Sequence, residues 1–259
     1  STGMPTRVQQ ADLLSSAYAS HGDTKHILLF PEDPGEAFEL SAAAFDLADR
    51  LQTPVITMSD LDLGMNDWTT APFKWDADRA YDRGKVLDAE GLDAVADWGR
   101  YLDVDDDGIG YRTYPGTHPD KGGHFTRGTS HDEYARYTEA GAPYVRSMER
   151  IAKKFETARA LVPAAEITPA AGGDSLQGVI YFGTTSASVR EALGSLHGDG
   201  IELDALRVRA FPFGDEVREF IEKHRTVFVV ELNRDGQMRT MLINDLEIDP
   251  AKLVPVLHY

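Results

Sequence analysis

In residues 26–58, HILLFPEDPGEAFELSAAAFDLADRLQTPVITM, two short apolar runs enclose a helical pattern. The first run extends from His26 to Phe30, where Pro31 closes it, and the second extends from Pro54 to Met58. Between them, apolar side chains recur at helical spacing: Phe38, Ala42, Phe45 and Leu51. Strand, helix and strand within about 35 residues form a βαβ unit. The stretch therefore predicts an α/β fold with a parallel sheet.

Residues 6–20 predict a helix ahead of this unit. Thr6 stands three residues before Gln9, which fits a capping box at a helix N-terminus. Apolar positions follow at helical spacing: Val8, Ala11, Leu14 and Tyr18. We expect this helix to extend from about Arg7 to Ser20, with Thr6 at its N-cap.

The last third of the chain repeats the alternation of strands and helices. Apolar runs predict strands at 178–182, 206–210 and 226–232. Helical patterns lie between them at 186–196 and 215–224. This order predicts a second parallel α/β domain over residues 178–259, after a first domain over residues 1–162. Residues 163–177 are rich in Pro and Gly without a period, and we expect them to be the linker.

A long irregular arm, residues 59–143, interrupts the first domain. Gly, Pro, Asp and aromatic residues are mixed there without a sustained period, over a length far beyond ordinary connections. Such a segment is usually functional or an interface arm. It leads into a predicted helix over residues 142–161, in which Pro143 suits the first turn. One apolar stripe marks that helix: Val145, Met148, Ile151, Phe155, Ala158 and Leu161.

Composition excludes several kinds of partner and site. The 259 residues carry a formal net charge of −17 at pH 7, which repels phosphate backbones and anionic lipid, so we expect neither nucleic acid nor a membrane as a partner. No apolar run approaches the roughly 20 residues that cross a bilayer. The chain has no cysteine, which excludes disulfides, thiolate metal sites and Cys-ligated iron–sulfur clusters. A cluster used by this protein must lie on another chain.

The two ends predict a piece of a longer chain. The sequence starts at Ser1 without an initiator Met, and nothing that follows reads as a signal peptide, so we expect a cytoplasmic protein. At the other end it stops at Tyr259 on apolar residues, without a solvated tail.

Two glycine motifs are poor candidates for cofactor sites. Gly198 to Gly200, with Asn233 downstream, is similar to the diphosphate and magnesium motif of thiamine enzymes, but it follows a helical stretch and its spacing to Asn233 is too long. We expect a helix C-terminus there. A strand-to-helix turn starts at Gly183 and could hold an anion, but an N-cap by Thr185 or Ser186 is the better interpretation.

Acidic residues at 103–108 match the start of a calcium-binding loop. Asp103, Asp105 and Asp107 alternate and are followed by Gly108, which permits a sharp turn. The twelfth position is Tyr114, so the bidentate Glu of such loops is missing. The alternatives are a calcium site completed from elsewhere and a solvated Asp-rich turn.

The strongest cluster of chemically active residues lies in residues 114–134. This Gly-punctuated loop contains His118, His124 and His131 together with Lys121 and Arg127. Scaffolds usually display functional groups on such loops. A substrate-facing or interface role is one interpretation, and histidines that are merely exposed are the other.

Several segments resemble one family, the α subunits of 2-oxoacid:ferredoxin oxidoreductases, in particular those that act on 2-oxoglutarate. The segments are STGMPTR at 1–7, QADLL at 10–14, YASHGD at 18–23, PVITMSD at 54–60, GTSHDEY at 128–134 and ELNRDGQMR at 231–239. Each is modest alone, but together they cover nearly the whole chain in order.

The resemblance implies a fold and a division of labour between subunits. The fold would be part of the domain that covers the pyrimidine ring of thiamine diphosphate, followed by a transketolase C-terminal-like α/β domain. A partner β subunit would hold the diphosphate with its magnesium and a [4Fe-4S] cluster. The implied reaction is oxidative decarboxylation of a 2-oxoacid to its acyl-CoA, with electrons passing to ferredoxin. For 2-oxoglutarate, this reaction belongs to the tricarboxylic acid cycle.

The resemblance also implies site residues. Thr2 and Thr6 match positions beside the substrate pocket, and Arg7 adjoins them. A helix N-terminus with a neighbouring guanidinium suits a carboxylate, although Thr6 could serve only as a cap. His131 and Asp132 match a loop that approaches the site, and a helix N-cap is the alternative for Asp132.

Two other functions compete with the oxidoreductase subunit, which would be active only in a hetero-oligomer. One is a non-enzymatic, calcium-stabilised interaction module built around Asp103, Asp105 and Asp107. The other is a subunit of a different transketolase-like thiamine enzyme, which the lack of a diphosphate motif disfavours.

Overall fold

The computed structural model describes residues 4, 5, 7–126 and 130–259. It confirms the predicted βαβ unit. Strands β1 (Ile27–Leu29) and β2 (Val55–Thr57) are parallel, and helix α2 (Pro34–Leu51) connects them. The side chain of Asp33 caps α2 by accepting a hydrogen bond from the N–H of Glu36, and Pro34 occupies the first turn.

A second sheet contains the strands predicted in the last third of the chain. Its order is β3-β5-β4-β7-β8, and all neighbours are parallel except β3 with β5. The strands are β3 (Glu166–Thr168), β4 (Gln177–Phe182), β5 (Asp204–Val208), β7 (Thr226–Glu231) and β8 (Leu253–Leu257). The helices are α6 (Thr185–Gly198), α7 (Asp215–Lys223) and α8 (Gln237–Leu246), and a 3-10 turn, η1 (Pro250–Lys252), precedes β8.

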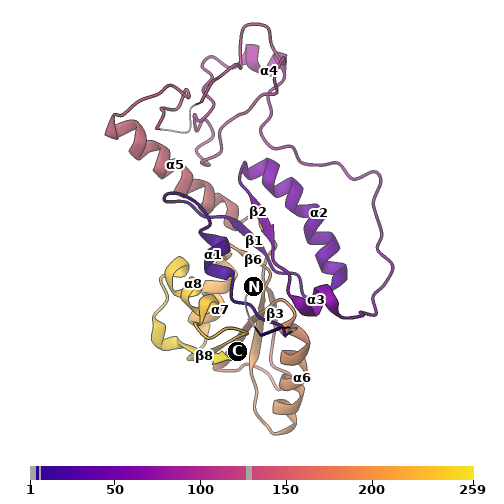
Figure 1. The fold of residues 1–259 in the computed structure, drawn as a ribbon. Coiled ribbons are helices and arrows are strands. Elements are labelled where there is room, and N and C mark those ends of the chain that lie inside the picture. Colours follow the sequence, from indigo (N-terminus) through magenta and orange to yellow (C-terminus); the bar gives the residue numbers. More distant parts are fainter. Residues whose placement is uncertain (1–3, 6, 127–129) are drawn as a thin grey trace.

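Helices cover both faces of this sheet, as Figure 1 shows with α6 on one side and α7 and α8 on the other. Side chains of α7 and α8 pack on the face that includes Ile180 and Val229. Val189 of α6 packs on the opposite face, against Val179 and Tyr181. The alternation along each strand thus separates the two layers.

The two predicted domains share structure. The short strand β6 (Ala210–Phe211) follows β5 directly but joins the first sheet, antiparallel to β1, in the order β2-β1-β6. One apolar cluster includes Leu13 and Leu28 as well as Leu206 and Met241. Because the two halves share a sheet and an apolar cluster, the division into two domains at residues 163–177 stays a prediction. Within this stretch, β3 pairs with β5, so these residues are not purely a linker.

The N-terminal helix is much shorter than predicted. Helix α1 (Leu13–Ala17) starts after Asp12, and no side chain caps it. The expected helix from Arg7 to Ser20 is wrong in its first turns, and Thr6 lies outside the described residues. Residues 8–12 instead have no regular secondary structure, and Gln10 bonds to the second sheet.

The arm is irregular, as predicted, and contains helices α3 (Leu61–Met65) and α4 (Ala89–Ala94). In Figure 1 it extends from α3 past α2 to the far end of helix α5 (Gly141–Arg159). Ion pairs attach it to α2: Arg79 with Asp46, and both Arg83 and Arg112 with Asp49. Helix α5 confirms the predicted stripe only in its second half, where Phe155 and Ala158 are buried, since Val145 is exposed and Leu161 lies beyond the end of the helix.

Over the described residues, no helix combines the length and the apolar character needed to cross a bilayer.

Candidate functional site

The segment that follows Arg7 is fixed to the carboxyl ends of strands in the second sheet. The Gln10 N–H donates to the carbonyl oxygen of Leu232 at 2.8 Å, and the Leu232 N–H donates to Gln10 Oε1 at 3.1 Å. The Gln10 amide Nε2 donates to the Phe182 carbonyl at 3.3 Å and to Thr185 Oγ1 at 3.0 Å. Buried Gln10 therefore bonds to the ends of both β4 and β7.

A buried polar network extends this contact. Asn233, which is 1% exposed, donates through Nδ2 to the Gln10 carbonyl at 3.1 Å and to Glu231 Oε2 at 2.6 Å. Glu231, at 0% exposure, also accepts from the N–H of Met238 at 2.8 Å, at the N-terminus of α8. Gln237 bonds back to the segment through the Ala11 carbonyl at 2.8 Å. Each buried polar group named here has a partner, so the segment is held rigidly.

The carboxyl ends of strands from both sheets meet at this point. A small cleft lies between Pro31 after β1, Ser59 after β2 and Gly183 after β4, and Gln10 also lines it. The Thr184 hydroxyl donates to Asp60 Oδ2 at 2.5 Å, which joins the two sheets. Ligands in open α/β sheets bind outside the carboxyl ends of the strands. This edge is therefore the candidate site.

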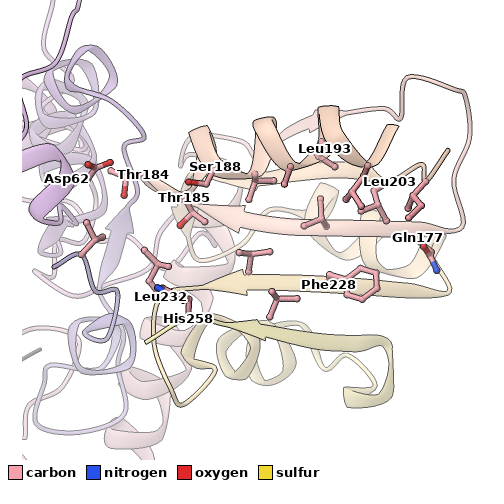
Figure 2. Close-up of a pocket in the computed structure, with 18 residues that line it drawn as sticks. Asp62, Gln177, Thr184, Thr185, Ser188, Leu193, Leu203, Phe228, Leu232 and His258 are labelled. Atoms are coloured by element: carbon pink, nitrogen blue, oxygen red, sulfur yellow. The ribbon is translucent and has the colours of Figure 1, made fainter. Parts of the chain in front are cut away.

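A larger groove opens beside it, with a volume of about 710 Å³, within the usual range for ligand sites. Figure 2 shows α6 above and the sheet below, with Asp62, Thr184, Thr185 and Ser188 at the end near the first sheet. Apolar side chains line the rest, among them Val179, Val189, Leu193, Phe228 and Val230. Val8 also lines the groove, so the residue after Arg7 reaches its wall.

The structure places only one of the three predicted substrate residues. Arg7 is exposed, and its N–H donates to the Met4 carbonyl at 3.2 Å. Thr2 and Thr6 lie outside the described residues. The predicted helix N-terminus next to Arg7 is wrong, since α1 begins at Leu13 and has only 5 residues. Any carboxylate bound here therefore depends on side chains and on the irregular segment before α1.

His131 and Asp132 lie in the arm. His131 stacks on Tyr101 with the ring centroids 4.2 Å apart, and the Asp132 carboxylate accepts from the N–H groups of Tyr134 and Arg136. This is a local turn, so the alternative of a helix N-cap is wrong. In Figure 1 the stretch of the arm that leads into α5, which contains both residues, lies far from the N-terminal segment, so this chain does not bring the two residues to Arg7.

Asp103, Asp105 and Asp107 do not form a set of calcium ligands in the structure. Asp103 Oδ1 accepts from the N–H groups of Asp107 and Gly108, and the ammonium of Lys85 lies 2.7 Å from Asp105 and 2.8 Å from Asp107. Burial opposes the charge of Lys85, but hydrogen bonds to both carboxylates raise its pKa. A protonated lysine thus stands where the metal would. In the part of the chain that the structure describes, no group of three His, Asp or Glu could hold a metal ion.

The three histidines of the 114–134 loop do not converge. His118 pairs with Asp93, His124 packs on the ring of Trp98, and His131 stacks on Tyr101. Each side chain therefore stabilises a different part of the arm.

The glycine motifs are helix ends. Helix α6 stops at Gly198 with Asp199 as C-cap, and Gly200 has a φ of +78°, which confirms the predicted turn. At the other end of α6 the predicted cap is wrong. The N-cap residue is Thr184 without a capping bond, since its hydroxyl bonds to Asp60, and Ser186 donates to the Gly183 carbonyl.

The sequence prediction missed Gln10, Asp60, Glu231 and Asn233. One signal was present, because Asn233 directly follows an apolar run read as a strand and Asp60 stands two residues after another. Polar residues at strand ends are the usual site residues of α/β sheets.

Comparisons with known proteins show what this chain is similar to. Residues 1–157 match the family model "Pyruvate flavodoxin/ferredoxin oxidoreductase, thiamine diP-bdg". The chain is 35% identical to the α subunit of 2-oxoacid:ferredoxin oxidoreductase 2 of Aeropyrum pernix, with 96% of this chain and 38% of that protein covered. It is 30% identical to the 2-oxoglutarate synthase subunit KorA of Methanothermobacter thermautotrophicus, with 92% and 60% covered.

A solved structure has the same fold over the whole chain. It is the 2-oxoglutarate:ferredoxin oxidoreductase of Magnetococcus marinus with 2-oxoglutarate, coenzyme A and succinyl-CoA bound, with a TM-score of 0.82 at 25% identity, and it covers 100% of this chain and 43% of that one. The chain thus spans less than two thirds of the length of each of these relatives. With the family model matched over residues 1–157, the chain belongs to the pyruvate flavodoxin/ferredoxin oxidoreductase family.

Proposed function

We propose that this chain is part of the α subunit of a 2-oxoglutarate:ferredoxin oxidoreductase in the cytoplasm that works in the tricarboxylic acid cycle. The reaction converts 2-oxoglutarate, coenzyme A and two oxidised ferredoxins into succinyl-CoA, CO₂, a proton and two reduced ferredoxins. The observation that carries the proposal is the docking of the Arg7 segment at the carboxyl ends of β4 and β7 through buried Gln10. The KorA relative and the M. marinus structure support 2-oxoglutarate as the 2-oxoacid.

Residues on the N-terminal segment bind the substrate in this proposal. The guanidinium of Arg7 attracts a carboxylate, and the hydroxyls of Thr2 and Thr6 donate to its oxygens. The network of Gln10, Asn233 and Glu231 holds the chain just after Arg7, and a fixed segment favours a fixed orientation of the substrate. Their role is to orient the 2-oxoacid, and they carry no proton in the reaction.

A partner β subunit supplies what this chain lacks. Without cysteine, the chain cannot bind a [4Fe-4S] cluster through thiolates. The residues of the Gly198 to Gly200 motif end a helix, and the described part of the chain offers no metal ligand group, so the diphosphate and its magnesium do not fit here either. The partner therefore holds them, and this chain contributes one wall beside the ring of thiamine diphosphate. When bound, that cofactor supplies the nucleophilic carbon and the electron sink for loss of CO₂.

The surface of the arm fits such a hetero-oligomer. Aromatic side chains of the arm stay exposed: Phe73 by 52%, Trp75 by 57%, Tyr114 by 51%, Phe125 by 78% and Tyr137 by 56%. Aromatic residues are enriched in protein interfaces. The arm thus provides a contact surface for another subunit, where His131 and Asp132 approach an assembled site.

The test is an assay of the full-length α subunit with and without the β subunit encoded beside it. We expect the pair to reduce a viologen dye only with 2-oxoglutarate and coenzyme A together, and to contain thiamine diphosphate and iron. Pyruvate should be the weaker substrate. Turnover by the α subunit alone would overturn the division of labour, and preference for another 2-oxoacid would overturn the assigned substrate.

A further inference from the structure

Three cationic side chains surround a small cavity on the side of α5 that faces the arm. The cavity measures about 60 Å³ and lies between the end of α2, the arm and α5. Its lining is Leu51, Gln52, Arg100, Tyr101, Ile109, Gly110, Arg150 and Lys154. The only ionisable groups among these eight residues are the three cations and the Tyr101 phenol.

These cations lack acidic partners, although the chain has 43 acidic and only 26 basic residues. Arg150 donates from Nη1 to the Gly108 carbonyl at 2.8 Å, while its Nε is buried without a hydrogen-bond partner. Lys154 donates to the Gln52 carbonyl at 3.4 Å and lies over the Phe155 ring, 5.6 Å from its centroid. Arg100 lies over the Tyr101 ring, 5.1 Å from its centroid, and forms no hydrogen bond or ion pair with the described residues.

The nearby carboxylate does not neutralise them. Asp103 attracts Arg150 electrostatically, but its Oδ1 accepts from the N–H groups of Asp107 and Gly108, and it forms no ion pair with the three cations. Exposed basic residues on the same helix have partners, as Lys153 has in Asp106 and Arg146 in Glu133.

Leaving the three charges together is unfavourable. Burial, joined by repulsion from Arg150 and Arg100, lowers the pKa of Lys154 to about 8. Burial likewise lowers the pKa of both arginines. Partly buried charges are normally paired, so this arrangement calls for an anion from outside the chain.

We propose that Arg100, Arg150 and Lys154 form a binding site for one phosphate group. A water molecule needs about 10–15 Å³, so a cavity of 60 Å³ has room for a single tetrahedral oxyanion. Two guanidinium groups offer paired donors and the ammonium a third direction, and a dianion balances this charge better than a monoanion. The bound group also links the arm, through Arg100, to α5, through Arg150 and Lys154. Free phosphate and the phosphate of a nucleotide share this chemistry.

The test is calorimetric titration of inorganic phosphate into the full-length α subunit with its partner. We expect binding at this site in the wild type, and an affinity reduced about tenfold or more by Lys154→Met, which keeps the length but removes the charge. Lys153→Met is the matched control, because Lys153 is the preceding residue of the helix and faces Asp106. The affinity of the Lys153→Met protein for phosphate should equal that of the wild type.

The outcome does not depend on catalytic activity, so it is separate from the proposed function. Equal affinities in wild type and Lys154→Met would overturn the site, as would the same thermal stabilisation by chloride at matched ionic strength. If Lys154→Met does not fold, Arg100→Gln replaces it, because Arg100 forms no hydrogen bond that folding needs. Phosphate should then raise the melting temperature of the wild type but not of Arg100→Gln. Displacement of phosphate by coenzyme A would support the site with a nucleotide as the source, and absence of displacement would support it with the free anion.

Discussion

At the scale of single residues, Arg7 is the substrate candidate that the structure describes. We predict that Arg7→Gln raises the KM for 2-oxoglutarate about tenfold or more and lowers kcat less, since a charge-assisted hydrogen bond to the substrate carboxylate is lost in ground and transition state alike. Steady-state kinetics of the complex of α and β subunits measures this. Arg234→Gln is the control, because Arg234 is exposed and pairs with the adjacent Asp235. An unchanged KM in Arg7→Gln would remove Arg7 from the substrate site.

Lys154 gives a prediction for stability against pH. Its pKa is about 8 in the folded protein, below the ordinary 10.5, because burial and two arginines disfavour the charge. Below pH 8 the ammonium is charged in both states, and its full cost opposes folding. As pH rises from about 8 toward 10.5, the folded protein has lost this proton while the unfolded chain keeps it, so the cost disappears.

Lys154→Met should therefore raise the free energy of unfolding at pH 7 by about 1–2 kcal/mol in phosphate-free buffer, after a discount for partial exposure. The gain should shrink toward zero near pH 10.5. Urea unfolding at several pH values measures it, with Lys153→Met as a control that shows no such trend. A gain that stays constant with pH would contradict the lowered pKa.

At the scale of elements, periodicity predicted what local sequence determines. The βαβ unit was predictable because Pro31 and Asp33 end one element and start the next within the sequence itself. The N-terminal helix was overextended because Gln10 bonds to Leu232, 222 residues away, and this long-range pairing outweighs a local helical pattern. Strand β3 was read as linker because it pairs with β5, which follows only after β4 and α6, so no local pattern reports the pairing.

Replacement of Gln10 tests this long-range pairing. Gln10→Ala removes the acceptor for the Leu232 N–H and the donor to Phe182 and Thr185, so we expect a loss of about 1–3 kcal/mol in the free energy of unfolding. Denaturant titration measures the loss. Gln9→Ala is the matched control, since Gln9 has no hydrogen bond to the described residues, and it should change stability by less than about 0.5 kcal/mol. Equal effects would show that the network does not fix the segment.

At the scale of the whole molecule, the site depends on contacts that no local pattern reports. It lies where β1, β2 and β4 end, and Asp60 and Thr184 come from opposite halves of the chain. The second sheet and its helices were predictable, but the crossing of β6 into the first sheet was not, because only two residues form that strand. The predicted substrate residues could be placed in sequence only through the resemblance, since neither periodicity nor spacing selects Arg7.

Asp245 on α8 tests how firmly the two halves are joined. Its side chain is 0% exposed and lies 2.6 Å from both Lys25, just before β1, and Arg159, at the end of α5. We expect Asp245→Ala to lower the free energy of unfolding by about 3–5 kcal/mol, because two cations at this junction then lose their carboxylate. Asp235→Ala, which removes an exposed ion pair, should cost less than about 1 kcal/mol. Hydrogen exchange should quicken in peptides from β1, α5 and α8 together in Asp245→Ala. Faster exchange confined to α8 would mean that the halves open independently and that the shared core does not couple them.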